Sequence, residues 1–271
     1  MLLNYSIPDI TPYINWTYFF YAWGLQRYEQ NAEKMQEALK LQQDAMITLQ
    51  QMEGKVQIRC LFRILQANSE GDDLWVDGIR IPLLRQQTPN KLDSHCLCLS
   101  DFVRPREQGI IDYIGIFASS VCSENEYQDI DPYRHLLIQT LSDRLAEAAT
   151  EKMHQYVRKT AWGYAPNEEL SIQDLLIEKF QGIRPAVGYP SLPDQSINLL
   201  LDQILQMKQI GITLTENGAM YPHASVSGLM IAHPAAHYFS IGKIGIDQLR
   251  DYAQRRGFST EEMKKFLPNH F

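Results

Sequence analysis

A change of apolar period early in the chain restricts its possible folds more than any other feature. Residues 29–53 carry apolar side chains at the three- and four-residue spacing of one helical face. Residues 56–64 alternate apolar and polar side chains instead, which is the period of a strand with one buried face. Gly54 lies between the two patterns and is suited to end the helix. The chain is therefore expected to combine helices with strands. The helical stripe comprises Met35, Ala38, Leu39, Ala45, Met46, Leu49 and Met52.

The same two periods predict the remaining elements. Asn15 is the expected N-cap of a short helix with an aromatic face, and Asp131 caps a long one. Further strands are expected at 73–77 and 79–84, as a hairpin, and at 95–102, 110–118, 212–216, 225–232 and 237–244. Further helices are expected at 132–160, 171–180, 194–208 and 247–256, with a last one after the capping box at Ser259. Strands in hairpins mixed with long helices favour an α+β fold over a doubly wound sheet.

Composition places the chain among globular proteins. Its 271 residues are 45% hydrophobic and 21% charged, and no linker divides them, so we expect one domain over 1–271 with an N-terminal helical part at 1–54. A net charge of −7 argues against nucleic acid or an anionic membrane as the main partner. No apolar run is long enough to span a membrane and no signal peptide is visible, which predicts a cytoplasmic protein.

The four cysteines do not indicate a metal site. Cys96 and Cys98 form a C-x-C pair without a second pair, whereas zinc sites use longer spacings. We expect reduced thiols within the core. His233 and His237 are four residues apart, but Pro234 between them favours a turn over a helical ligand pair.

The loop 182–190 is the first candidate site. Its prolines fix φ, its glycines permit close backbone approaches, and Arg184 and Tyr189 carry its only long side chains with polar ends. A guanidinium group binds carboxylates or phosphates in a bidentate manner, and a tyrosine ring stacks on flat ligands. A plain structural turn between two helices explains the same residues, so both readings remain open.

Acidic residues form a second candidate feature. Asp143, Glu147 and Glu151 are spaced at i, i+4 and i+8, on one face of the long helix. This face is either solvated or an acidic wall toward a cationic ligand. Glu178 precedes Arg184 by six residues. An arginine for a carboxylate, acids for an amine and aromatic rings for a flat group suit a ligand that joins an amino acid to a nucleoside. The polar side of the helix is expected to carry Asp143, Arg144, Glu147, Glu151 and Arg158.

Nucleotide-binding and hydrolase motifs are absent from the sequence. Neither G-x-G-x-x-G nor G-x-x-x-x-G-K-[ST] occurs, which argues against a Rossmann or P-loop cradle. No G-x-S-x-G nucleophile motif occurs either.

Several short segments together carry a family resemblance. They are Leu141-Ser-Asp-Arg-Leu-Ala-Glu-Ala, Val157-Arg-Lys-Thr-Ala-Trp-Gly-Tyr-Ala-Pro-Asn, Gln181-Gly-Ile-Arg-Pro-Ala-Val-Gly-Tyr-Pro, Leu214-Thr-Glu-Asn-Gly-Ala-Met, Ala224-Ser-Val-Ser-Gly, His233-Pro and Tyr238-Phe239. In this order they resemble the activation domain of cobalamin-dependent methionine synthase, from about residue 13 to residue 267. The R-P-A-x-G-Y-P loop is the most specific part of the match.

The resemblance implies both a fold and a function. The family fold is one α+β domain in which helices surround a twisted antiparallel sheet. The family domain binds S-adenosylmethionine and supports reductive remethylation of cob(II)alamin, with an electron from flavodoxin or a similar reductase. This chain has no room for the other methionine synthase modules, so it is expected to act on cobalamin carried by a separate chain. Such a domain alone is a component of a methyltransferase and not a complete enzyme.

Family roles extend to matching positions in this sequence. The resemblance implies that Arg184 holds the ligand carboxylate, that Ala186 and Gly188 offer backbone contacts, and that Tyr238 and Phe239 contact the ligand. Four further positions match functional residues. Glu147 and Glu178 match acids near the ligand amine and sulfonium, Tyr189 would lie near the cobalamin, and Asp143 matches an acid that meets a histidine of the cobalamin domain.

Two positions depart from the family pattern. Asn15 replaces the aspartate of Y-I-D-W, so the ligand ammonium loses a charged acceptor, and we expect binding weaker by roughly 1–2 kcal/mol. Phe239 lacks a hydroxyl group that is often present. These departures leave room for an alternative, a sensor or interaction module that binds S-adenosylmethionine without methyl transfer. A conventional methyltransferase acting on a small acceptor is a third possibility, which the missing Rossmann motif disfavours.

Overall fold

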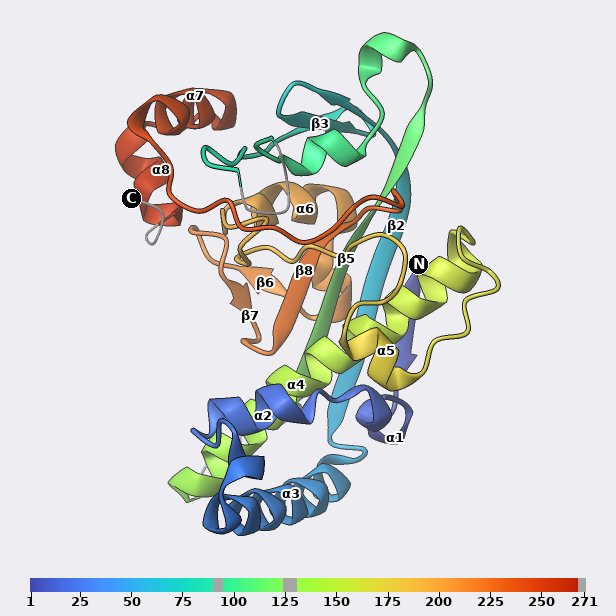
Figure 1. Cartoon of the computed structure of the whole chain (residues 1–271), viewed down its shortest axis with the longest axis vertical. Helices are drawn as coiled ribbons and strands as arrows, with labels where there is room; N and C mark the ends of the chain where they lie inside the picture. The colour runs from blue at the N-terminus through green and yellow to red at the C-terminus, as the bar shows by residue number, and fades with distance from the viewer. Residues whose placement is uncertain (90–94, 124–130, 268–271) are drawn as a thin grey trace.

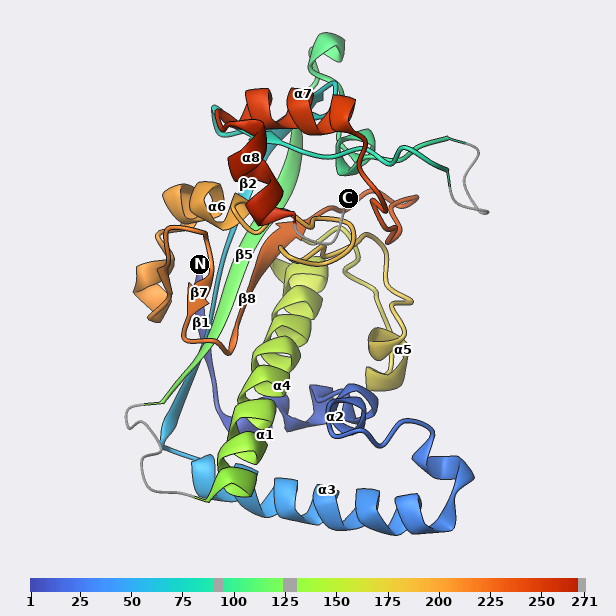
Figure 2. The same ribbon diagram turned by 90° about the vertical axis from the view of Figure 1, so that its left-hand side faces the viewer.

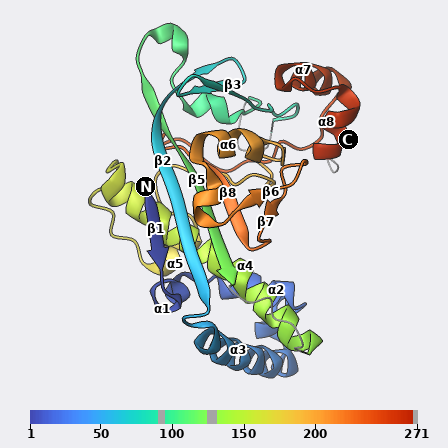
Figure 3. The ribbon, with the colours of Figure 1, turned by 180° about the vertical axis from the view of Figure 1, so that it is seen from behind.

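Two long antiparallel strands form the centre of the fold. The computed structural model describes residues 1–89, 95–123 and 131–267 (Figure 1). β2 (Val56–Glu70) pairs with β5 (Asp112–Ser123), from Val56 opposite Ser123 to Ala67 opposite Asp112. β3 (Asp73–Val76) and β4 (Ile79–Pro82) continue the sheet beyond β2, and β8 (Ser225–Met230) continues it beyond β5. β1 (Leu2–Tyr5) also pairs with β2, on the side opposite β5, as Figure 3 shows.

The sheet separates two hydrophobic cores. Strand alternation sends Leu61 and Ile116 into one core and their neighbours Phe62 and Phe117 into the other. α6 (Ile197–Leu205), α7 (Ile246–Arg256) and α8 (Thr260–Phe266) cover the first face. α1 (Ile7–Ile10), α2 (Trp16–Ala22), α3 (Ala32–Met52) and α4 (Pro132–Tyr156) cover the second, and Figure 2 shows α4 and α6 on opposite sides of the sheet. The expected single α+β domain with a helix-covered antiparallel sheet is confirmed.

Helix α4 is the long element that supports the site. The Asp131 side chain accepts a hydrogen bond from Arg134 N at 3.0 Å, and Pro132 occupies the first turn, as expected. Leu141 and Leu145 are fully buried beneath the helix. Beyond Tyr156 the chain widens into a π-helical turn at Val157–Ala161, a geometry often found at functional sites.

Most expected strands are present, but two expectations are wrong. The hairpin of β3 and β4, the strand at 110–118 and the strand at 225–232 are confirmed, and 212–216 contains β6 (Thr213–Leu214), which pairs with β7 (Met220–Tyr221). In 95–102, Asp101 accepts a hydrogen bond from Cys98 N at 2.8 Å, and this turn folds Leu99–Phe102 into a 3₁₀-helix. In 237–244, Ile241 N donates instead to Pro190 O, and Gly242 has a φ of 72° that ends any extended run.

Two expected helices are shorter than their sequence patterns. The Ser171–Asp174 capping box is confirmed, but α5 (Ile172–Leu176) ends early because Glu178 is left-handed, with φ 60°. α6 ends at Gln206, which has φ 56°, and a 3₁₀ turn (Met207–Ile210) follows. Ser196 is the N-cap residue of α6, while the Asp194 side chain accepts from Ser196 N and closes the turn before the helix.

Some predicted helical faces need correction. In α3, Met35, Leu39 and Met46 are exposed, because the helix packs on the face of Ala38, Ala45, Leu49 and Met52. Glu151 in α4 and Arg158 in the π-helical turn after α4 were expected on the polar side of one long helix, yet both are buried. Each forms an ion pair with a segment that lies outside the helix, so their burial reflects tertiary contacts rather than helix amphipathicity.

The four cysteines are free thiols. Burial raises the pKa of Cys60 and of Cys98 to about 12, so both stay protonated and unreactive in the core. Cys96 and Cys122 are only half-buried. Within the described ranges, no helix has the length and apolarity that a bilayer crossing requires.

Candidate functional site

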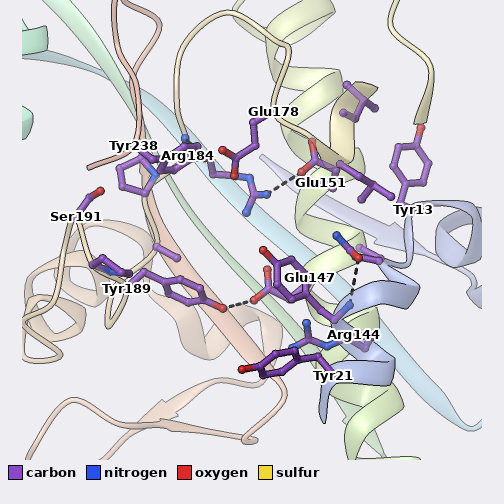
Figure 4. Close-up of a pocket in the computed structure, with 18 of the residues that line it drawn as sticks. Tyr13, Tyr21, Arg144, Glu147, Glu151, Glu178, Arg184, Tyr189, Ser191 and Tyr238 are labelled. Carbon is purple, nitrogen blue, oxygen red and sulfur yellow. Dashed lines mark hydrogen bonds and ion pairs between the residues drawn. The ribbon is translucent and has the colours of Figure 1, made fainter. Parts of the chain in front are cut away.

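A cavity of about 740 Å³ lies between α2, α4, α5, the loop 182–190 and residues 238–240 (Figure 4). Its volume is within the range typical of small-molecule sites. Three glutamates and two arginines line it, an excess of one negative charge. The sequence-predicted residues in its wall are Asn15, Glu147, Glu178, Arg184, Ala186, Tyr189, Tyr238 and Phe239. Gly188 and Asp143 lie outside this wall.

The loop 182–190 is held against the edge of β8. Ile183 and Ile231 exchange two backbone hydrogen bonds of 2.9 Å, and Val187 N donates to Ser227 O at 2.9 Å. Gly228 permits this contact, since a Cβ there would lie 2.2 Å from Pro185 O. Ala186 and Gly228 form the non-hydrogen-bonded pair between these bonds, so the Ala186 amide points away from β8. The sheet thus fixes the loop and leaves Arg184 and Ala186 facing the cavity.

Arg184 is anchored on α4. Its Nη2 atom lies 2.9 Å from Glu151 Oε2, and its backbone amide donates to the Tyr238 hydroxyl at 2.9 Å. Its guanidinium carbon lies 5.8 Å from the ring centroid of Phe117. Burial opposes the charge of Arg184, but the surrounding carboxylates, led by Glu151, leave its pKa above the ordinary value. Arg184 is therefore a permanent cation in the cavity wall.

Three polar atoms in the cavity wall have unused hydrogen-bonding capacity. Arg184 Nε, Glu151 Oε1 and Arg144 Nε are buried without a partner among the described residues. Buried polar groups are normally paired, so this cluster is unusual. A polar ligand in the cavity would supply the missing partners.

Tyr189 closes one side of the cavity. Its hydroxyl donates to Glu147 Oε1 at 2.5 Å, which joins the loop to the middle of α4 (Figure 4). Burial, together with Glu147, raises the pKa of Tyr189, so the hydroxyl remains a donor. Burial likewise raises the pKa of Tyr238 to about 12. Gly188, which precedes Tyr189, has a φ of 88°, and its amide donates a hydrogen bond to Leu192 O at 2.8 Å.

Glu178 occupies a backbone position that favours glycine. It follows α5 with φ 60°, while Lys179 N bonds to Asp174 O and Glu178 N bonds to Leu175 O. These bonds are those of a Schellman motif, whose left-handed residue is usually glycine. Burial raises the pKa of the Glu178 carboxyl, although Arg184 opposes this shift. An acid at a strained backbone position is typical of a functional residue.

Asn15 and three tyrosines form the wall opposite the loop. Asn15 Oδ1 accepts from Tyr18 N at 3.3 Å, which confirms the predicted N-cap of α2. Tyr18 and Tyr21 are 62% and 63% exposed, so they present aromatic rings at the mouth of the cavity. Tyr13 donates to Gln155 Oε1 at 2.7 Å.

Asp143 lies beside the cavity and faces a different part of the chain. His223 Nδ1 lies 3.4 Å from Asp143 Oδ1, and the histidine side chain is 80% exposed. Burial raises the pKa of Asp143, against the effect of His223. The acidic face of α4 is therefore not simply solvated, because Asp143, Glu147 and Glu151 each contact a different segment.

A second buried ion pair lies behind the loop and outside the cavity wall. Arg158 donates to both carboxylate oxygens of Glu168 at 2.8 Å, in side chains 0% and 6% exposed. Arg158 Nη1 also lies 2.8 Å from His154 Nδ1. Burial and the two nearby arginines hold the pKa of His154 well below its usual range, so the ring is neutral. This network supports the end of α4.

Several cavity residues were missed in the sequence. Glu151 was recognised only as part of the acidic series, and its contact with Arg184 was not foreseen. The other residues missed in the wall are Tyr13, Tyr18, Tyr21, Ala22, Arg144, Ala148, Leu175, Leu176, Pro185, Pro190, Ser191 and Ser240. Proximity to Asn15 and Glu147 on predicted helices was the available signal for the tyrosines and for Arg144. Among the described residues, no cluster of metal-ligating side chains occurs.

Two comparisons with known proteins bear on this cavity. Residues 6–257 match the family described as vitamin B12 dependent methionine synthase, activation domain. The chain is also similar to the crystal structure of the MetH reactivation domain bound to AdoHcy, with a TM-score of 0.91 and 36% sequence identity. That similarity covers 100% of this chain and 90% of the other. The family match includes every residue that lines the cavity.

Proposed function

Because this chain belongs to the activation-domain family of vitamin B12-dependent methionine synthases, we propose that its cavity binds S-adenosylmethionine. We further propose that the domain supports reductive remethylation of cob(II)alamin carried by a separate methionine synthase chain. AdoHcy, which the similar crystal structure contains, is the thioether left when S-adenosylmethionine gives up its methyl group. The negative excess of the cavity wall suits the extra positive charge of the sulfonium ligand.

The observation that carries this proposal is the unused capacity around Arg184. Its Nε atom is a buried donor without a partner among the described residues, in a cavity large enough for the ligand. A carboxylate is the natural partner of a guanidinium group. The Ala186 amide, Tyr238 and Phe239 lie beside Arg184 in the same wall and would contact the rest of the ligand.

Other residues have proposed roles at the two ends of the ligand. Glu147 and Glu178 would lie near its amine and sulfonium groups. Tyr189, which is 49% exposed, would face the cobalamin when the partner docks. Asp143 would meet a histidine of the partner, which has to displace His223 of this chain. Gly188 has a supporting role, because its amide already bonds to Leu192 O.

The proposed reaction consumes one electron and one methyl group. A flavodoxin-like reductant would supply one electron to the cob(II)alamin of the partner chain. The reduced cobalt would then take the methyl group, so that a cobalt–carbon bond forms as the sulfonium carbon–sulfur bond breaks, and the ligand would leave as a neutral thioether. The protein contributes orientation, because Arg184 and the surrounding cavity wall would hold the ligand with its sulfonium group at a fixed place. The exposed rings of Tyr18, Tyr21 and Tyr189 provide an apolar rim for the partner to exclude water.

A reconstitution in trans tests the proposal. The chain is mixed with a cobalamin-binding methionine synthase chain in the cob(II)alamin form, S-adenosylmethionine and reduced flavodoxin. We expect the absorption spectrum of methylcobalamin to appear, and to depend on all four components. Absence of methylcobalamin despite saturating ligand would contradict the remethylation role.

The alternative function is a sensor or interaction module that binds the ligand without methyl transfer. Asn15 and Phe239 favour it, since Asn15 lacks the negative charge and Phe239 the hydroxyl group that the family pattern carries. Tight binding of S-adenosylmethionine without methylcobalamin formation would support this alternative.

A further inference from the structure

The Arg184–Glu151 ion pair has a buried, unpaired polar atom on each side. Arg184 Nη2 and Glu151 Oε2 lie 2.9 Å apart, in side chains 11% and 10% exposed. Arg184 Nε and Glu151 Oε1 have no hydrogen-bond partner within the described part of the chain. Both side chains line the cavity, so a ligand head that carries an acceptor and a donor would find a complementary group on each of them.

The head group of an α-amino acid has this composition. Its ammonium nitrogen lies only about 2.5 Å from its carboxylate carbon, because both are bonded to the same Cα. A carboxylate at Arg184 therefore places the ammonium group next to whichever acid adjoins Arg184. Glu151 is the acid in direct contact with Arg184, whereas Glu147 Oε1 contacts Tyr189 and Asn15 Oδ1 contacts Tyr18 N.

We infer that Glu151 receives the α-ammonium group of the ligand while Arg184 receives its α-carboxylate. The pair then selects zwitterionic amino-acid heads over simple carboxylates. This inference deepens the proposed function and rests on it, because it assumes that the cavity takes an S-adenosyl amino acid.

The charge balance of the buried pair explains the selection. Arg184 and Glu151 neutralise each other in the free protein. A ligand with only a carboxylate would add one uncompensated negative charge beside this buried pair, and burying an unpaired charge is unfavourable in free energy. A zwitterion adds equal and opposite charges, and each of them lies against its complement on the protein.

A comparison of two ligands on two proteins tests the inference. The ligands are S-adenosylhomocysteine and its analogue in which hydrogen replaces the α-amino group, and calorimetry gives the Kd of each. The wild-type chain should bind S-adenosylhomocysteine about 10- to 100-fold more tightly, as expected for a charge-assisted hydrogen bond. In Glu151→Gln, which keeps the side-chain shape, this preference should fall below about 3-fold.

Glu168→Gln is the matched control. It removes the carboxylate of a comparably buried arginine–glutamate pair that does not line the cavity, so it should keep the wild-type preference. An unchanged preference in Glu151→Gln, or an equal loss in Glu168→Gln, would overturn the inference. If Glu151→Gln does not fold, equal affinity of the wild-type chain for the two ligands would still overturn the inference. Failure of the wild-type chain to bind any S-adenosyl ligand would overturn the proposed function as well.

Discussion

Asn15 differs from aspartate by one amide nitrogen, and that nitrogen removes a negative charge from the cavity wall. The side-chain oxygen of Asn15 accepts a hydrogen bond from Tyr18 N at 3.3 Å, so Asn15 caps α2 in the free protein. Asparagine and aspartate cap helices about equally well. The two side chains therefore differ at this site in ligand electrostatics and hardly at all in helix stability.

Asn15→Asp should strengthen binding of S-adenosylmethionine by about 5- to 30-fold, the equivalent of roughly 1–2 kcal/mol. An ammonium group has three donors, so an acceptor at position 15 adds to Glu151 rather than replacing it. Asn31→Asp is the matched control, because Asn31 caps α3 in the same way and lies outside the cavity wall. Calorimetry that gives an unchanged or weaker Kd for Asn15→Asp would show that the missing charge does not limit binding.

At the scale of elements, one helix and one loop assemble the cavity. Successive turns of α4 present Asp143, Glu147 and Glu151, and the loop 182–190 delivers Arg184 and Tyr189 to the last two. The loop holds its position because it bonds to β8, which is part of the central sheet. Helix α5 adds Glu178 from the other side through a left-handed C-terminal residue.

Glu178→Gly should stabilise the fold while it weakens ligand binding. Glycine relieves the strain of the left-handed conformation, but it also raises the conformational entropy of the unfolded chain. The free energy of unfolding should therefore rise by only about 0.5–1 kcal/mol. Thermal unfolding measures the gain, and calorimetry measures the loss of affinity. Gln206→Gly is the matched control, because Gln206 ends α6 with φ 56° outside the cavity wall and should change stability alone. Weaker folding of Glu178→Gly, or unchanged ligand affinity, would contradict this account.

The stability gain at Glu178 should also depend on pH. Burial raises the pKa of this carboxyl in the folded state, so the folded chain holds the proton more tightly than the unfolded chain. The ionised carboxylate therefore destabilises the fold as pH rises through the folded pKa. Glu178→Gly should gain more stability at pH 7 than at about pH 4, where the group is largely protonated in both states. An equal gain at both pH values would mean that backbone strain alone causes it.

At the scale of the whole molecule, the cavity wall combines residues from Tyr13 to Ser240. The sequence motifs indicated Glu147, Arg184 and Tyr189 in this wall, because the loop and the acid spacing are local patterns. The Arg184–Glu151 contact was not predictable in this way, since it depends on how the loop packs against α4 across 33 positions.

Backbone conformation was the other source of error. The pattern in 237–244 predicted a strand, and Phe239 and Ile241 are buried, but Ile241 N bonds to the loop at Pro190 O instead of a neighbouring strand. The end of α5 was misplaced because a glutamate, unlike glycine, gives no signal for a left-handed residue. Both errors arise from tertiary contacts that overrule local preference.

The affinity of Arg184→Lys for S-adenosylmethionine tests the central claim most directly. Lysine retains the positive charge beside Glu151. It lacks the planar guanidinium group, whose several N–H donors can bind a ligand carboxylate and Glu151 at the same time. Arg80→Lys, at a residue that pairs with Asp73 outside the cavity wall, is the control and should bind as the wild-type chain does. We predict that calorimetry gives a Kd at least about 10-fold weaker for Arg184→Lys, with the unfolding temperature little changed. A Kd equal to that of the wild-type chain would show that Arg184 does not hold the ligand carboxylate.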